Sequence, residues 1–290
     1  MSDRPADAGG AAPVVILCRP QMGENVGAAA RAMLNFGLTE LRLVAPTCGW
    51  PNAKAVVAAS GAAEVLNGAR VFERLTDALA DLHHTLASTA RPRGLDKDVV
   101  GPGEAARRAR GLAAAGRRVG LLFGPERTGL TNDELLLADA IVSIPVNPGH
   151  ASLNLAQAVL LCAYEWLRAA EGRGAAAEGG DADAAADAAA AQAGREPATK
   201  AEVAGLVEHL VRELDEVDFF RSPDRRGSLI HAITVLLERR RLARPEVHLL
   251  RGIVKDLSGG RRARKQPPQG GQAGARRGGA RPEPSGEDAA

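Results

Sequence analysis

The sequence predicts an α/β domain built on a parallel sheet, followed by a small helical domain. Between residues 13 and 170, short apolar runs with the length of buried strands alternate with helical patterns, which is typical of such a sheet. Residues 171–198 are mainly Ala, Gly, Asp and Glu and predict a flexible linker. Helical periodicity returns over residues 199–257. Residues 1–12 and the basic tail at 258–290 lack core-forming residues, so both are expected to be disordered.

The first elements form a β-α-β unit. Residues 14–18 are an apolar strand candidate, and a helix is expected to start near Val26 with Asn25 as its N-cap. Gly37 is placed to end this helix, and residues 41–44 predict the next strand. The connecting loop lacks the G-x-G-x-x-G pattern, so a dinucleotide site is not favoured.

The middle of the domain contains the elements that predict a pocket. Residues 52–80 show a helical pattern, residues 85–87 predict a strand and residues 104–116 a helix. Two further strands are expected at 119–123 and 140–144, and each is followed by a loop broken by Gly and Pro. Ligands of open α/β sheets bind beyond the carboxyl ends of the strands. Two such loops on neighbouring strands therefore predict one pocket.

The loop from Gly124 to Gly129 invites comparison with a phosphate-binding P-loop. Its glycine spacing agrees, but that motif continues with Lys and Ser or Thr, and here Leu130 and Thr131 follow. Nucleotide hydrolysis is therefore not expected. Thr131 and Glu134 have the spacing of a capping box, which predicts a helix start. A capped turn without any ligand remains an alternative for this loop.

Two helices carry further signals. Residues 153–170 are apolar nearly all round, so this helix is expected to be buried or to lie at an oligomer interface, and we expect a dimer. Gly27, Arg31 and Asn35 recur every four residues and share one face of the first helix. The guanidinium of Arg31 suits a phosphate or a carboxylate. A solvated helix arginine is the alternative.

The composition excludes several classes of protein. With 45% hydrophobic and 25% charged residues and a net charge of +2, the chain can form a core and permits an RNA partner without requiring one. Cys18, Cys48 and Cys162 lie far apart and are typical of core residues in a reduced compartment. The histidines lack ligand spacing, so no metal site is expected. Without a signal segment or membrane span, a cytoplasmic protein with no membrane partner is expected.

Basic residues cluster in the second domain. Residues 224–226 and 239–244 place arginines at the ends of a predicted helix, either as solvated charge or as an RNA-facing patch. The tail adds Arg261, Arg262, Arg264 and Lys265, which suit nonspecific binding of phosphates.

Three blocks, residues 25–37, 123–130 and 144–155, together resemble the SPOUT class of RNA 2′-O-methyltransferases, in the TrmH-like superfamily and in particular its TrmJ branch. The blocks read NVGAAARAMLNFG, FGPERTGL and IPVNPGHASLNL, and their order and separation make the signal specific. The likeness spans residues 14–170 and continues past the linker between residues 219 and 253. It implies a parallel sheet closed by a deep trefoil knot, an exception among folds.

The resemblance also implies a cofactor and a set of site residues. S-adenosylmethionine would be bound in a bent form, largely by backbone groups. The residues implied to hold it are Ser88, Thr89, Ala90, Gly124, Ile144, Ala151, Ser152 and Leu153. Catalytic roles fall to Arg31, Asn25 and Ser152, with Arg31, Glu126 and Asn154 at the substrate. Because the pKa of arginine is above 12, Arg31 is expected to position the ribose and stabilise the alkoxide, not to remove a proton.

The substrate and partners follow from the same resemblance. TrmJ enzymes methylate the 2′-oxygen of nucleotide 32, a cytidine or uridine, in the tRNA anticodon loop, and act as homodimers in which each site draws on both protomers. A tRNA partner and no DNA partner are therefore expected. Two alternatives remain: a ribosomal RNA 2′-O-methyltransferase of the same superfamily, and an RNA-binding protein that kept the knot without catalysis.

Overall fold

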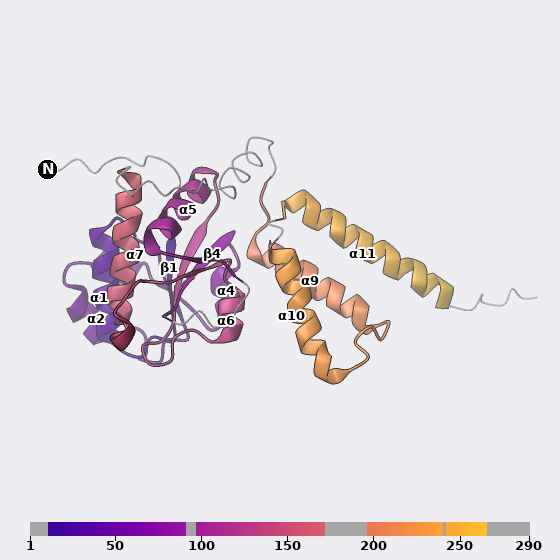
Figure 1. Ribbon diagram of the computed structural model, residues 1–290, viewed down its shortest axis with the longest axis horizontal. Coiled ribbons are helices and arrows are strands. Elements are labelled where there is room, and N and C mark those ends of the chain that lie inside the picture. The colour runs from indigo at the N-terminus through magenta and orange to yellow at the C-terminus, as the bar shows by residue number, and fades with distance from the viewer. Residues whose placement is uncertain (1–10, 91–96, 172–195, 240–241, 266–290) are drawn as a thin grey trace, which may run out of the picture.

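The computed structural model describes residues 11–90, 97–171, 196–239 and 242–265 of the 290 (Figure 1). Residues 1–10 of the predicted disordered N-terminus, 172–195 of the linker and 266–290 of the basic tail lie outside the described residues. The same holds for Arg91 to Gly94, the second half of the loop after the predicted strand at 85–87.

The first domain is a parallel sheet, as predicted. In the described part it has seven strands in the order β3-β2-β1-β6-β4-β7-β5, and every neighbouring pair is parallel. The strands are β1 (Val14–Cys18), β2 (Leu41–Val44), β3 (Arg70–Phe72), β4 (His84–Ser88), β5 (Val99–Val100), β6 (Val119–Phe123) and β7 (Ala140–Val142).

Helices cover both faces of this sheet. The interior strand β1 is buried on both sides, and its residues alternate: Val15 and Leu17 join one core, while Ile16 and Cys18 join the other. The first core receives α1 (Gly23–Asn35), α2 (Ala53–Ala59), α3 (Ala63–Asn67), α5 (Pro102–Ala114) and α7 (Leu155–Ala170). The second receives the short helices α4 (Leu75–Leu79) and α6 (Asn132–Leu136).

Some sequence expectations were wrong in detail. The pattern at residues 52–80 contains the edge strand β3, whose three residues are too few for periodicity to reveal. Helix α1 starts at Gly23 with Met22 as N-cap, so Asn25 does not cap it. The strands β6 and β7 are not direct neighbours, because β4 lies between them. This order brings the loop after β4 to the C-terminal edge of the sheet, between the loops after β6 and β7.

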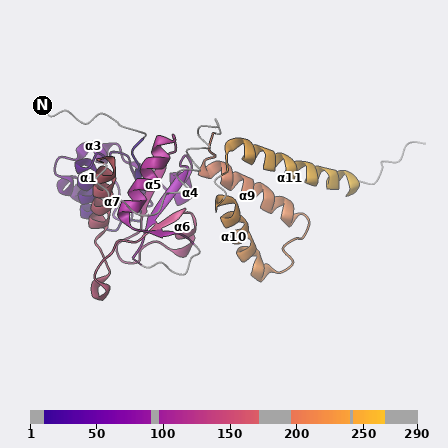
Figure 2. The same cartoon turned by 45° about the horizontal axis from the view of Figure 1, so that its top comes forward.

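The second domain consists of α9 (Lys200–Asp215), α10 (Pro223–Arg239) and α11 (Arg244–Lys265) (Figure 2). Its small core is formed by Ala198, Leu206 and Val247 with partly buried neighbours. Helix α11 continues to Lys265, past the predicted boundary at residue 257. No described helix has the length and apolarity that crossing a bilayer requires.

The start of α9 is fixed to the first domain at the N-terminal edge of the sheet. The backbone N–H groups of Lys200 and Ala201 donate to the carbonyl oxygens of Leu82 and Ala80. The Lys200 ammonium lies 2.8 Å from a carboxylate oxygen of Asp139, the residue before β7. Burial would raise the pKa of Asp139, but Lys200 and other partners hold it well below its usual range. The buried ion pair therefore joins the two domains.

Candidate active site

A hollow of about 230 Å³ opens at the carboxyl ends of β6, β4 and β7, which are adjacent in the sheet. It is lined by the residues that follow these strands and by the start of α7. Its walls comprise Ser88, Thr89, Ala90, Phe123, Gly124, Pro125, Glu126, Arg127, Thr128, Gly129, Leu130, Ile144, Val146, Ala151, Ser152, Leu153, Leu155 and Ala158. The predicted pocket between loops thus exists, with β4 contributing the third wall.

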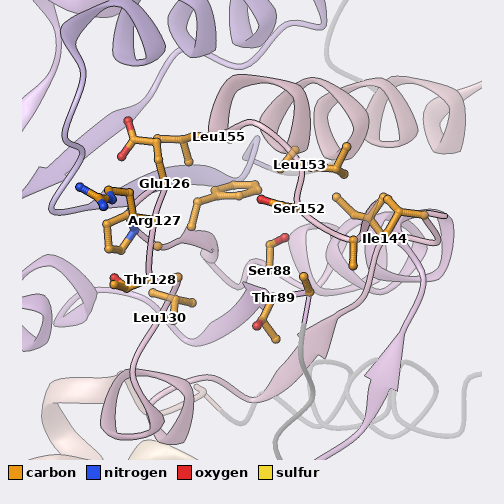
Figure 3. A pocket seen from close by; sticks show the side chains of 18 residues that line it. Ser88, Thr89, Glu126, Arg127, Thr128, Leu130, Ile144, Ser152, Leu153 and Leu155 are labelled. Carbon is orange, nitrogen blue, oxygen red and sulfur yellow. The ribbon is translucent and has the colours of Figure 1, made fainter. Parts of the chain in front are cut away.

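Figure 3 shows how the side chains divide the hollow. Ser88 and Ser152 lie near its middle, with Ile144 on one side and Glu126 and Arg127 on the other. Hydroxyls therefore stand between an apolar wall and a charged rim. This division suits a ligand with an apolar or aromatic part and a polar end.

The backbone comes close to the hollow where side chains are small or absent. A Cβ added to Gly124 would lie 2.3 Å from the Leu130 nitrogen, so the loop folds back on itself only because this residue is glycine. Gly129 completes the turn with a φ of 67°, in the left-handed region. The loop therefore presents main-chain donors and acceptors at the wall.

Glu126 ties this loop to the loop after β1. Its carboxylate accepts hydrogen bonds from the backbone N–H groups of Gln21 (2.9 Å) and Met22 (3.2 Å) and from Asn25 Nδ2 (2.7 Å). Asn25 Oδ1 in turn accepts from Asn154 Nδ2 at 2.9 Å. One chain of hydrogen bonds thus joins the three motif blocks. Asn154 also caps α7 by accepting from the backbone of that helix.

A second carboxylate strengthens the same tie. Glu134 accepts two hydrogen bonds from the Arg19 guanidinium, of which Nη2 to Oε2 measures 2.9 Å, and one from the Thr131 N–H. Burial alone would raise the pKa of Glu134, but these bonds lower it below its ordinary value. The predicted capping box of Thr131 and Glu134 is confirmed. Its link to Arg19 is nonlocal, and only the position of Arg19 directly after a strand hinted at it.

All eight residues expected at the cofactor line the hollow. Of the expected catalytic and substrate residues, Ser152 and Glu126 line it, whereas Asn25 and Asn154 lie behind Glu126. The expectation that Arg31 stands beside the pocket is not met within one chain. Arg31 is an exposed residue of α1 and is not part of the lining.

Sequence reasoning missed part of the wall. Phe123, Val146, Leu155 and Ala158 line the hollow and were assigned only to strands, loops or helices. Their apolar character gave no signal beyond burial. Among the described residues, no group of His, Cys, Asp and Glu has the arrangement of a metal site.

The arrangement is suited to binding a nucleoside derivative. Main-chain groups after β4, β6 and β7 can meet a base edge, small residues let the ligand approach them, and Ile144 offers an apolar surface to an aromatic ring. The residues present thus fit the S-adenosylmethionine implied by the resemblance.

Comparisons with known proteins agree with this geometry. The family model described as SpoU rRNA Methylase family matches residues 12–164. The model described as tRNA methyltransferase TrmJ, C-terminal domain, matches residues 201–268. The first match spans more than half of the chain and contains every lining residue.

Individual relatives extend the likeness over most of the chain. The tRNA (cytidine/uridine/adenosine-2′-O-)-methyltransferase TrmJ of Pseudomonas aeruginosa is 35% identical over 246 residues, which cover 83% of this chain and 92% of the relative. The tRNA (cytidine/uridine-2′-O-)-methyltransferase TrmJ of Klebsiella pneumoniae is 33% identical over 257 residues, which cover 84% of this chain and 95% of the relative.

A solved structure has the same architecture. The crystal structure of TrmJ from Z. mobilis ZM4 matches with a TM-score of 0.71 and 43% identity, covering 85% of this chain and 99% of that chain. Sequence blocks, sheet topology and helical extension therefore agree. The chain belongs to the SpoU methylase family, in its TrmJ branch, and is a methyltransferase.

Proposed function

We propose that this chain transfers the methyl group of S-adenosylmethionine to the 2′-oxygen of a tRNA ribose, at nucleotide 32 of the anticodon loop. The observation that carries the proposal is the convergence of the motif blocks: the second and third line one hollow, and the first is bonded to that wall through Asn25. The cofactor would supply a methyl group on a sulfonium, which a ribose oxygen can attack.

The residues of the hollow divide the work of binding. The backbone after Ser88, Gly124 and Ile144 would hold the cofactor, with Ser152 and Leu153 closing the site. Glu126 and Asn25 keep the loops in register through their hydrogen bonds, which makes them positioning residues in this proposal. Asn154 caps α7, and in this proposal it also acts near the substrate.

Arg31 would act from a second protomer. It is exposed in the single chain, and no described residue makes an ion pair with it. Helix α7 packs beside α1 and exposes Leu160 (41%) and Tyr164 (42%), an apolar surface suited to a dimer interface. In such a homodimer, Arg31 of one protomer would bind the ribose and phosphate at the site of the other and stabilise the developing alkoxide.

A tRNA substrate is favoured over ribosomal RNA by the second domain. The match to the TrmJ C-terminal domain lies outside the catalytic fold, and the relatives named as tRNA methyltransferases are covered over more than nine-tenths of their length. The names of these two relatives differ in whether adenosine is accepted. We propose cytidine or uridine as the target base, and the mapping experiment tests it.

The direct test uses total tRNA, ribosomal RNA and labelled S-adenosylmethionine. The expected result is transfer to tRNA, with the methylated ribose mapped to nucleotide 32 by its resistance to alkaline cleavage. Transfer to ribosomal RNA alone, or to a base instead of a ribose, would contradict the proposal. Cofactor binding without transfer to either RNA would favour a binding protein.

A further inference from the structure

The second domain contains a hollow of about 390 Å³ between α9 and α11. Arg212 of α9 and Arg251 and Lys255 of α11 line it, against one carboxylate, Glu208. We call this hollow the basic groove. Arg251 and Lys255 are four residues apart on a helix, so both project from the same face.

Two of the arginines singled out in the sequence, Arg226 and Arg244, are paired outside the basic groove. Arg226 donates two hydrogen bonds to Asp215, at 2.7 and 3.1 Å. Arg244 donates to Glu202 at 2.6 Å and to Glu196 at 2.5 Å. The charges of Arg226 and Arg244 are therefore paired within the domain.

The cations of the basic groove are held much less tightly. Arg212 is 66% exposed, and its ion pair with Glu213 measures 3.7 Å. Arg251 reaches only the backbone carbonyl oxygen of Gly205, at 3.5 Å, and no ion pair to Lys255 exists within the described residues. The absence of a side chain at Gly205 leaves space for the Arg251 guanidinium, because an added Cβ would lie 3.3 Å from Arg251 Nη2. The positive charge therefore remains available to a ligand.

We propose that the basic groove binds phosphate groups of the tRNA backbone. This inference rests on the proposed tRNA substrate and deepens it by locating a contact away from the reacting ribose. Exposed Arg and Lys side chains gain affinity for RNA by releasing counterions, without reading the bases. The start of α9 is fixed to the first domain by Lys200, so RNA held in the groove is also held relative to the hollow beside β4.

A pair of substitutions at Gly252 tests the groove by charge alone. Gly252 lies in α11 at the groove, and an added Cβ would meet nothing within 4 Å. Glutamate and lysine also have a higher helix propensity than glycine. Gly252→Glu is expected to weaken tRNA binding about tenfold and Gly252→Lys to strengthen it, with neither lowering the melting temperature. Equal affinities for the two variants would overturn the proposal.

A double substitution tests the native cations. Arg251→Gln with Lys255→Gln is expected to reduce the slope of log affinity against log salt by about 1.5 to 2, to raise KM for tRNA roughly tenfold and to leave kcat nearly unchanged. The matched control is Arg221→Gln with Arg225→Gln, which removes the same charge from exposed residues outside the groove. A control that weakens binding equally, or an unchanged double variant, would overturn the proposal.

The same series separates this inference from the proposed function. The unaltered full-length chain is assayed in parallel for methyl transfer to tRNA. If it transfers methyl groups and the groove variants match it in affinity and salt slope, only the groove is wrong. If the unaltered chain neither binds nor methylates tRNA, both proposals fail.

Discussion

The two edges of the sheet use ionic side chains in opposite ways. At the C-terminal edge, Glu126 and Glu134 reach across from the segment after β6 to the loop after β1 and leave an open hollow beside them. At the N-terminal edge, Arg42 is fully buried against Asp81. Lys200 pairs there with Asp139, and their side chains are only 11% and 14% exposed.

This difference separates binding from stability. At the N-terminal edge the charges satisfy one another and fill the space, so removing one leaves a buried partner without compensation. At the C-terminal edge the carboxylates position loops whose backbone faces the hollow. We therefore expect substitutions at the first edge to change folding, and substitutions at the second to change ligand binding and turnover.

The largest effect is expected for Lys200→Met. The substitution leaves the buried Asp139 carboxylate without its ammonium partner, at a cost of about 3–5 kcal/mol in the free energy of unfolding. Denaturant unfolding measures it. Lys54→Met is the matched control, since Lys54 pairs with Glu24 on the surface, and its effect on stability should be far smaller. Equal effects of the two variants would remove the contrast between a buried and a surface pair.

Arg31→Ala is expected to lower turnover about 10²- to 10³-fold, the usual loss when one group that stabilises a developing oxyanion is removed. Cofactor affinity and unfolding free energy should stay near those of the unaltered protein, because Arg31 is exposed and outside the lining. Single-turnover kinetics with tRNA measures the loss. Arg74→Ala, another exposed arginine, serves as control. Turnover retained by Arg31→Ala would remove the catalytic assignment.

Mixed dimers sharpen this prediction. Arg31→Ala protomers are combined with protomers whose hollow is filled by Ile144→Arg. If each site takes its arginine from the other chain, each mixed dimer has one complete site. Because about half of the dimers in a random mixture are mixed, the mixture should regain up to about a quarter of the activity of the unaltered protein. A mixture as inactive as its parents would show that Arg31 does not act across an interface.

Glu126→Gln is expected to weaken cofactor binding about tenfold and to cost about 1–2 kcal/mol in stability. The backbone of Gln21 and Met22 and the side chain of Asn25 all donate to the Glu126 carboxylate. The NH2 group of a glutamine side chain would face one of these donors and could not accept its hydrogen bond. Calorimetry and denaturant unfolding measure the two effects. Glu104→Gln is the control, because Glu104 only pairs with Arg108 one turn along α5. Unchanged cofactor affinity would show that the tie between the loops does not shape the hollow.

The smallest effect concerns acid stability. Hydrogen bonds from Arg42 lower the pKa of Asp81 to about 2, so the unfolded chain takes up a proton on this group before the folded chain does. The stability due to this group is therefore full above about pH 4 and is lost as the pH falls toward 2. Because the Asp81 carboxylate is 42% exposed, we expect it to contribute only about 1 kcal/mol to the free energy of unfolding. Asp81→Asn should reduce the loss of unfolding free energy between pH 5 and pH 2, and an unchanged loss would contradict this assignment.

Local patterns predicted much of the fold. The strands at 14–18 and 119–123 and the capping box of Thr131 and Glu134 were read correctly, because apolar runs and caps depend on neighbouring residues. The edge strands β3 and β5 are too short for such a signal. The trefoil knot, implied by the resemblance, stays a prediction.

Nonlocal contacts account for what sequence reasoning missed at the site. The position of β4 between β6 and β7 depends on the folded topology, and so does the bond from Arg19 to Glu134. The burial of Lys200 against Asp139 joins residues of two domains, which no local pattern reports. Motif blocks identified the lining of the hollow, but not that Arg31 lies outside it within one chain.

In the proposed function, the C-terminal edge of the sheet binds the methyl donor. Titration calorimetry of the full-length chain with S-adenosylmethionine tests it most directly, alongside Ile144→Arg, which places a large charged side chain in the hollow. We expect one bound molecule per chain and at least a hundredfold loss of affinity in the folded variant. Binding undiminished by Ile144→Arg, or no binding to the unaltered chain, would contradict it.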